Sequence, residues 1–304
     1  MAYLNNISKQ AGRADVEVFD PHNLPSNGSW PETFINTHDG STMRLVPAGE
    51  FTMGSTGKDI ESARMMDKDG QSFALHETPQ SQIFVPSFYL SVFAVSNEQF
   101  ARFLCERRPG PALFDLWVYK TAHIIKPEHE GEPYHINHGF ERHPAIHVTW
   151  FGADAYCRWA KLRLPTEIEW EKAARGTDAR LFPWGDKWHD DYLRWNRGNR
   201  PESEPTVAVD AHPEGRSPYG IFQMAGNVAE WCEDWFQPNA YTEHALGNRR
   251  PPPSGNERVL RGGTCEQLHK LKFRCAMRQS STPVFTNMDF TGIRCACDLP
   301  RIAP

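Results

Sequence analysis

The chain has 304 residues, a formal charge of −5 and a mean hydropathy of −0.61. This length allows one large domain or two small ones, and the mild acidic balance argues against a dedicated nucleic-acid-binding protein. No apolar run approaches the ~18 residues of a membrane-spanning helix, and the N-terminal segment lacks the apolar core of a secretory signal. We therefore predict a cytoplasmic protein without a membrane span.

Turn-forming residues and tryptophans dominate the composition. The 24 prolines and 22 glycines interrupt helices and strands, so much of the chain must be loop. Ten tryptophans can anchor such loops, because each buries a large area. The composition excludes a helical bundle and a regular strand–helix repeat, and favours an irregular fold.

The N-terminal segment 1–40 is polar and rich in turn signals, and it is predicted to be an irregular leader before a single domain at 41–304. That domain opens at 43–54 with two short strands separated by a Pro-Ala-Gly turn. A further strand is expected at 82–89, with Pro86 marking an edge or a bulge.

Capping residues predict two helices. One starts after Ser96, which has capping-box spacing, and the other spans 167–175 between a capping box and a glycine. A third helix is expected at 152–161 from its apolar spacing. Segments 55–80 and 177–255 show little periodicity and are predicted to be loop.

The C-terminal part contains three further short apolar segments, 258–261, 273–277 and 292–296, each predicted to be a strand. The first runs into a Gly-Gly pair.

Eight segments in chain order carry a family resemblance. They are RLVPAGEFTMGS (44–55), ETPQ (77–80), VFAVSNEQFARFL (92–104), HPAIHVTWFGADAYCRWAKLRLPTEIEWEKAARG (143–176), FPWGD (182–186), YGIFQMAGNVAEWCEDWF (219–236), RVLRGG (258–263) and TGIRCA (291–296). Together they resemble the formylglycine-generating enzyme family, also called the sulfatase-modifying factor domain. The resemblance implies an α+β fold, a loop-rich variant of the C-type-lectin-like fold with a small antiparallel core sheet and two to three helices.

Catalytic members of that family bind copper through two cysteines five residues apart, after the Gly-Gly strand. Soft copper(I) favours two thiolate ligands. By resemblance Cys265 is the candidate first ligand, but the residue five positions later is Lys270. A protonated ammonium cannot bind a cation, so the copper pair is not intact.

Two interpretations of Cys265 stay open. His269 follows it by four residues, and Cys232 lies after the GNVAEW segment, so a mixed Cys/His site for copper or iron is chemically sound. In the other interpretation Cys265 fills the place of an aromatic core residue of non-catalytic relatives, as a buried free cysteine.

The resemblance also bears on other cysteines. Cys157 and Cys295 occupy positions that resemble a disulfide pair in some relatives. Cys275 resembles half of a second pair whose partner position here is Ala174, so it is expected to be unpaired.

A structural calcium ion is the second metal that the resemblance implies. Its ligands would come from Gln223, Gly226, Val228 and Glu230, an oxygen-only set with one carboxylate. Alternatively, the Gln and Glu side chains only hydrogen-bond the loop. A second calcium loop would lie near 194–198, where an arginine stands in place of an asparagine, and no ion is expected there.

Six of the 13 histidines lie between residues 123 and 147. Their spacing is not that of helical metal ligands, so a solvated or packed loop is expected.

Two functions follow from these observations. The first is a ligand-binding, protein-binding or degenerate family member, which the lysine at position 270 favours. The second is a non-standard oxygen-dependent oxidase or oxygenase that uses Cys265 and His269 with copper or iron in peptide or small-molecule tailoring. The sequence does not identify the peptide, protein or small molecule that would be bound.

Overall fold

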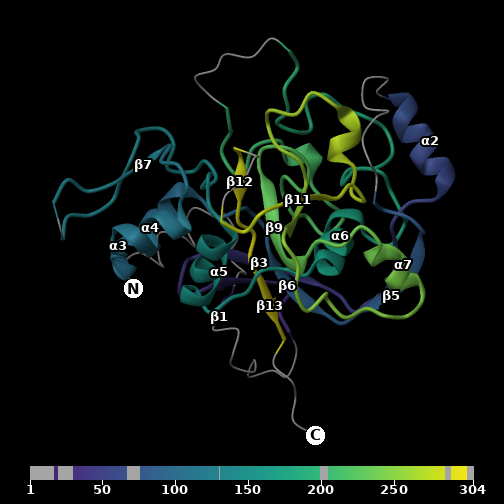
Figure 1. The fold of residues 1–304 in the computed structure, drawn as a ribbon, viewed down its shortest axis with the longest axis horizontal. Helices are drawn as coiled ribbons and strands as arrows, with labels where there is room; N and C mark the ends of the chain where they lie inside the picture. Colours follow the sequence, from purple (N-terminus) through teal and green to yellow (C-terminus); the bar gives the residue numbers. More distant parts are fainter. Residues whose placement is uncertain are drawn as a thin grey trace, which may run out of the picture.

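The computed structural model describes residues 17–19, 30–66, 76–129, 131–198, 205–284 and 289–299. Most of the predicted leader, and residues 67–75 of the predicted loop at 55–80, lie outside the described residues. The described chain has the expected α+β composition, with short elements joined by long packed loops (Figure 1). None of its helices combines the length and the apolar character needed to cross a membrane.

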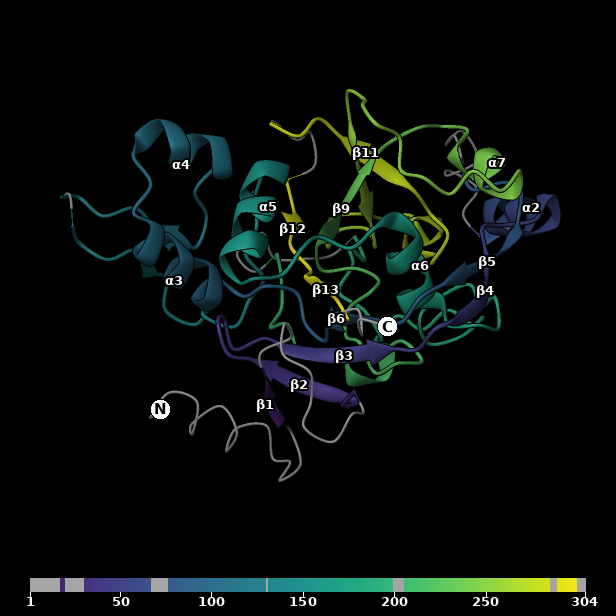
Figure 2. The same ribbon diagram turned by 90° about the horizontal axis from the view of Figure 1, so that it is seen from below.

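The larger sheet brings the two ends of the domain together (Figure 2). Its strands, in spatial order, are β1 (Glu17–Phe19), β2 (Thr33–Asn36), β3 (Thr42–Val46), β6 (Phe88–Ser91) and β13 (Ala296–Asp298). Only the β1–β2 pair among them is parallel. Because Phe34 on β2 is fully buried, the packed domain starts before residue 41.

A second sheet and two hairpins complete the strands. The sheet runs in the order β11 (Gln279–Ser281), β10 (Arg258–Arg261), β9 (Ala229–Trp235) and β12 (Thr291–Gly292), and the hairpins are β4 (Gly49–Met53) with β5 (Ser81–Val85) and β7 (Ile124–Ile125) with β8 (His135–Ile136). The structure thus has two principal sheets, each with one parallel pair, where one antiparallel core sheet was expected.

Several strand predictions are confirmed, the one at 273–277 is wrong, and the one at 292–296 is met only at its ends, by β12 and β13. Both strands within 43–54 exist, although they pair with β6 and β5 and not with each other. The strand predicted at 82–89 is divided at Pro86 into β5 and β6, as that proline suggested. The strand predicted at 273–277 is absent, because a 3-10 helix, η3 (Lys270–Phe273), and a turn from Arg274 to Met277 occupy this segment.

Six α-helices lie in the described residues, more than the two to three expected. They are α2 (Gly57–Met66), α3 (Asn97–Arg107), α4 (Pro111–Trp117), α5 (Trp150–Trp159), α6 (Glu167–Arg175) and α7 (Ala240–Ala245); a further 3-10 turn is η2 (Pro213–Gly215). The three predicted helices are confirmed as α3, α5 and α6, and both capping boxes are formed. The missed helices are short or polar, so they carry little apolar periodicity.

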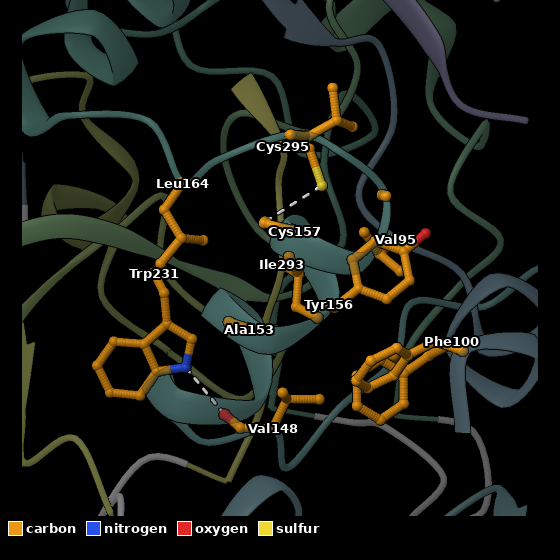
Figure 3. Packing of buried hydrophobic residues seen from close by; sticks show 14 of the residues in the cluster. Val95, Phe100, Val148, Ala153, Tyr156, Cys157, Leu164, Trp231, Ile293 and Cys295 are labelled. Carbon is orange, nitrogen blue, oxygen red and sulfur yellow. Dashed lines mark hydrogen bonds between the residues drawn. The ribbon is translucent and has the colours of Figure 1, made fainter. Parts of the chain in front are cut away.

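The main core surrounds α5, between the two sheets (Figure 3). Tyr156 and Trp231 are fully buried there, and the indole N–H of Trp231 donates to the carbonyl oxygen of Val148 at 2.9 Å. The thiols of Cys157 and Cys295 lie in the same core with their sulfur atoms 3.5 Å apart. The resemblance therefore placed these two cysteines correctly as spatial neighbours.

Candidate functional site

The candidate site starts where two glycines turn the chain away from β10. Gly262 and Gly263 have φ angles of +88° and +77°, a region that favours glycine. A Cβ atom on Gly263 would lie 2.7 Å from the side-chain oxygen of Gln267, so no larger residue fits without a shift. The amide of Cys265 then donates to the carbonyl oxygen of Asn227 at 2.9 Å, which fixes this turn against the loop before β9.

Cys265 lies in an apolar environment. Its side chain is fully buried in a cluster completed by Ala94, Ile146, Val209, Val228 and Phe290. These neighbours offer no metal-binding atom in their side chains. The position therefore favours the packing interpretation of this cysteine over the ligand interpretation.

Lys270, in the place of the second copper cysteine, lies beside aromatic rings. Its ammonium nitrogen is 5.3 Å from the ring centroid of Trp188 and 5.8 Å from that of Trp195. The two indoles are themselves perpendicular, with centroids 5.0 Å apart. Such faces attract a cation, so the two indoles hold the lysine side chain in place. His269, immediately before it, is half-buried at the start of η3.

The other sulfur considered for a mixed site packs elsewhere. Cys232 lies on β9 in the apolar cluster that contains Trp170 and Tyr241, and burial raises the pKa of its thiol well above the usual value. In the part of the chain that the structure describes, no three His, Cys, Asp or Glu side chains converge as a metal site. The resemblance thus implies two thiolates at positions where this chain has Cys265 and Lys270.

Gln223, the first predicted calcium ligand, is occupied by protein groups. Its side-chain amide donates to the carbonyl oxygens of Ala208 at 2.9 Å and Ala211 at 3.2 Å, and its oxygen accepts from the amide of Asn227 at 2.7 Å. The side chain thus joins the loop before β9 to residues 208–211.

Glu230, the only carboxylate of the predicted calcium set, is 1% exposed and forms an ion pair. Arg294 holds both of its oxygens, at 2.6 and 2.8 Å, and the indole N–H of Trp170 donates to one of them at 2.7 Å. A carboxylate already neutralised by a bidentate guanidinium is a poor ligand for calcium, which needs anionic oxygen.

The two remaining predicted ligands, Gly226 and Val228, are positioned by close packing. A Cβ atom on Gly226 would lie 2.5 Å from the carbonyl oxygen of Arg194, so glycine is required where these two loops meet. Val228 packs in the cluster around Cys265. The structure shows protein partners for the two side-chain ligands, and the calcium site stays a prediction.

A buried ionic network beside this site was not anticipated from the sequence. Two carboxylates of α6, Glu167 and Glu171, face Arg261 of β10 at 2.9 and 2.7 Å, and Arg278 binds Glu167 through both carboxylate oxygens. All four residues are at most 4% exposed. The spacing of acidic side chains by four residues along α6, on a helix that also carries Trp170 and two alanines, is the sequence signal that could have indicated it.

The histidine-rich segment forms separate contacts and not a common site. His123 stacks on Phe140 with ring centroids 3.8 Å apart, and His143 hydrogen-bonds the hydroxyl of Thr206 at 2.8 Å. His147 hydrogen-bonds the hydroxyl of Tyr119 at 3.0 Å, and burial lowers its pKa to about 4. These contacts are those of a packed loop, as expected.

Two cavities large enough for a small ligand lie away from Cys265. One of about 530 Å³ lies beside α7, and one of about 450 Å³ lies where α3 meets α4.

Comparison with known proteins identifies the fold and the family. Residues 31–299 match the sulfatase-modifying factor enzyme 1-like domain. The chain is 31% identical over 333 residues to the formylglycine-generating enzyme of Bos taurus, covering 96% of this chain and 82% of that protein. It is 28% identical to the inactive C-alpha-formylglycine-generating enzyme 2 of Mus musculus, covering 90% of this chain and 91% of that protein.

Among solved structures, PvdO from Pseudomonas aeruginosa superimposes with a TM-score of 0.63 at 20% identity, over 89% of this chain and all of that one. The architecture is therefore the loop-rich variant of the C-type-lectin-like fold that formylglycine-generating enzyme relatives share. With a family model that matches nearly the whole described chain, this protein belongs to the formylglycine-generating enzyme, or sulfatase-modifying factor, family.

Proposed function

We propose that this protein is a binding member of its family, which recognises a ligand or another protein and does not oxidise cysteine with copper. The observation that carries the proposal is the surroundings of two residues, Cys265 and Lys270. The first is buried among apolar side chains, and the second places an ammonium beside two indoles where a second thiolate would be needed. The match to a mouse protein that is named as an inactive formylglycine-generating enzyme supports the absence of this oxidation.

A cytoplasmic location is part of the same proposal. The chain has an odd number of cysteines, and all seven are present as thiols in the structure. Reduced cysteines are typical of the cytoplasm, where thiol reductants act.

Metal binding and oxygen consumption test the proposal together. The protein is loaded anaerobically with copper(I) or with iron(II), freed of excess metal, and assayed for bound metal and for oxygen uptake with a cysteine-containing peptide. We expect no metal that depends on Cys265 and no conversion of the peptide, because the site offers one buried thiol. The alternative, an oxygen-dependent metalloenzyme, is supported if the wild type binds stoichiometric copper or iron and consumes oxygen. Both properties must then be lost in Cys265→Ala.

A matched control is needed because Cys157 and Cys295 are adjacent thiols that can bind copper(I) themselves. Copper that persists in Cys265→Ala but is lost in Cys157→Ser belongs to that pair and leaves the proposal intact.

A further inference from the structure

The cavity of about 530 Å³ beside α7 is separate from the Cys265 site and has a different composition. Its volume lies within the range of about 300–1,000 Å³ that is typical of small-molecule sites. One wall is α7 with the residues that precede it, and the other is the segment that ends in Pro251–Pro253. In Figure 1, α7 lies at the periphery of the molecule.

His244 provides a hydrogen-bond acceptor in the cavity wall. The residue is 6% exposed, and its Nδ1 lies 3.1 Å from the carbonyl oxygen of Asn248. A carbonyl can only accept, so Nδ1 carries a proton, and in that tautomer of the imidazole Nε2 is the acceptor. Among the described residues no group donates to Nε2, and the side chain lines the cavity. A ligand there must present a hydroxyl or N–H donor.

Asn239 provides a second polar group. It occupies the N-cap position of α7, yet its side chain makes no capping hydrogen bond. Its amide is thus not used by the helix, and it lines the same cavity, where it can both donate and accept. Gln237 adds another amide of this kind.

The net charge and shape of the lining select the class of ligand. Glu243 and Arg250 are the two charged side chains of opposite sign in the wall, so the lining has no net charge that favours an ion. The three prolines form a rigid apolar surface that needs no ordering on binding. A matching ligand is neutral, carries several hydroxyl groups and has an apolar face.

We propose that this cavity binds a neutral saccharide, with a sugar hydroxyl donating to Nε2 of His244 and others pairing with the amides of Asn239 and Gln237. The proposal rests on the proposed binding function, for which it names the ligand class and the site. The binding function is tested by copper binding at Cys265, and the cavity proposal is tested by glycoside binding. Failure of one proposal is therefore distinguishable from failure of the other.

Ligand-observed NMR on the full chain tests the proposal. The probes are the methyl glycosides of glucose, galactose, mannose and N-acetylglucosamine, with inorganic phosphate and a neutral tripeptide as competing chemistries. We expect saturation transfer to at least one glycoside and none to phosphate or the tripeptide. If no glycoside binds, or if only phosphate or the tripeptide does, the proposal is wrong.

Two variants locate the binding. Asn239→Ala removes an exposed side chain that the helix does not use, so the fold is retained, and the loss of a hydrogen bond should weaken glycoside binding about tenfold. His244→Phe should weaken it at least as much, and circular dichroism checks its folding. His138→Gln, at a fully exposed histidine outside the cavity, should leave the affinity unchanged. Equal affinities in wild type and Asn239→Ala would overturn the assigned site.

Discussion

Asp234 illustrates how burial changes the chemistry of a single residue. It lies on β9, 6% exposed, and one carboxylate oxygen accepts from the backbone N–H of Glu167 at 2.7 Å. Burial, with the negative charge of Glu167 as the next cause, raises its pKa to about 7 from the usual 3.8. Because the folded state holds this proton more tightly than the unfolded state, its contribution to stability is complete below about pH 4 and is lost as the pH rises to about 7.

Asp234→Asn should therefore stabilise the protein at pH 8 by about 2–4 kcal/mol and flatten the change in stability between pH 4 and 7. The asparagine oxygen can still accept from Glu167, so the hydrogen bond is kept. Urea unfolding across this pH range measures the effect. The control is Asp191→Asn, at a side chain that is 87% exposed. A variant less stable than wild type at pH 8 would contradict the prediction.

The titration of His147 changes the stability of the protein with pH in the opposite direction. Its pKa is lowered to about 4, so its contribution is complete above the usual value of 6.5 and is lost as the pH falls from there to about 4. The measured pH profile is thus a sum of opposing terms, and the comparison of wild type with Asp234→Asn isolates one of them.

At the scale of elements, α6 connects strands that belong to different sheets. Although it is rich in charged residues, seven of its nine positions are buried. One oxygen of Glu171 accepts from the amide of Gly54 at 2.8 Å and from Arg175 at 2.9 Å, and the other accepts from Tyr241 and Arg261. Lys172 meanwhile donates to the carbonyl oxygens of Pro47, Gly49 and Val85. The helix therefore connects β4, β5 and β10 through polar groups that are buried away from water. These groups depend on one another for their hydrogen bonds.

Glu171→Gln should lower the free energy of unfolding by about 3–5 kcal/mol, because it leaves buried guanidinium groups without their counter-charge. Guanidinium chloride denaturation measures the change. Asp154→Asn is the matched control, since it breaks the pair with Arg158, whose side chain is 75% exposed, and should cost less than about 1 kcal/mol. Similar losses in both variants would contradict a special role for the buried network.

At the scale of the whole molecule, an ion pair joins the loop before β9 to both sheets. Glu230 pairs with Arg294, which also donates to the carbonyl oxygens of Ser91 and Phe222. This guanidinium supplies the positive charge that balances the buried carboxylate of Glu230.

The melting temperature should consequently be the same in millimolar calcium and in EDTA, because the carboxylate of Glu230 is already paired. Differential scanning calorimetry provides the measurement. A rise of several degrees with calcium that is lost in Gln223→Ala would instead establish the calcium site that the resemblance implied.

Local features of the fold were predictable where the determining atoms are close in sequence. Ser96 and Thr166 cap helices whose third residues return the hydrogen bond, so the starts of α3 and α6 follow from four-residue patterns. The C-terminal strand at 273–277 was mispredicted because apolar residues at 271 and 273 suit both a strand and a tight buried turn. Short α4 and α7 depend on tertiary packing more than on periodicity.

The sequence by itself determined the family, the capped helices, the neighbouring positions of Cys157 and Cys295, and the presence of a lysine five residues after Cys265. Only the tertiary structure decided that Cys265 faces apolar side chains, that Glu230 pairs with an arginine 64 residues away, and that His244 lines a cavity. The physical reason is that burial and charge pairing depend on groups brought together by the fold, whereas capping and turn geometry depend on neighbours along the chain.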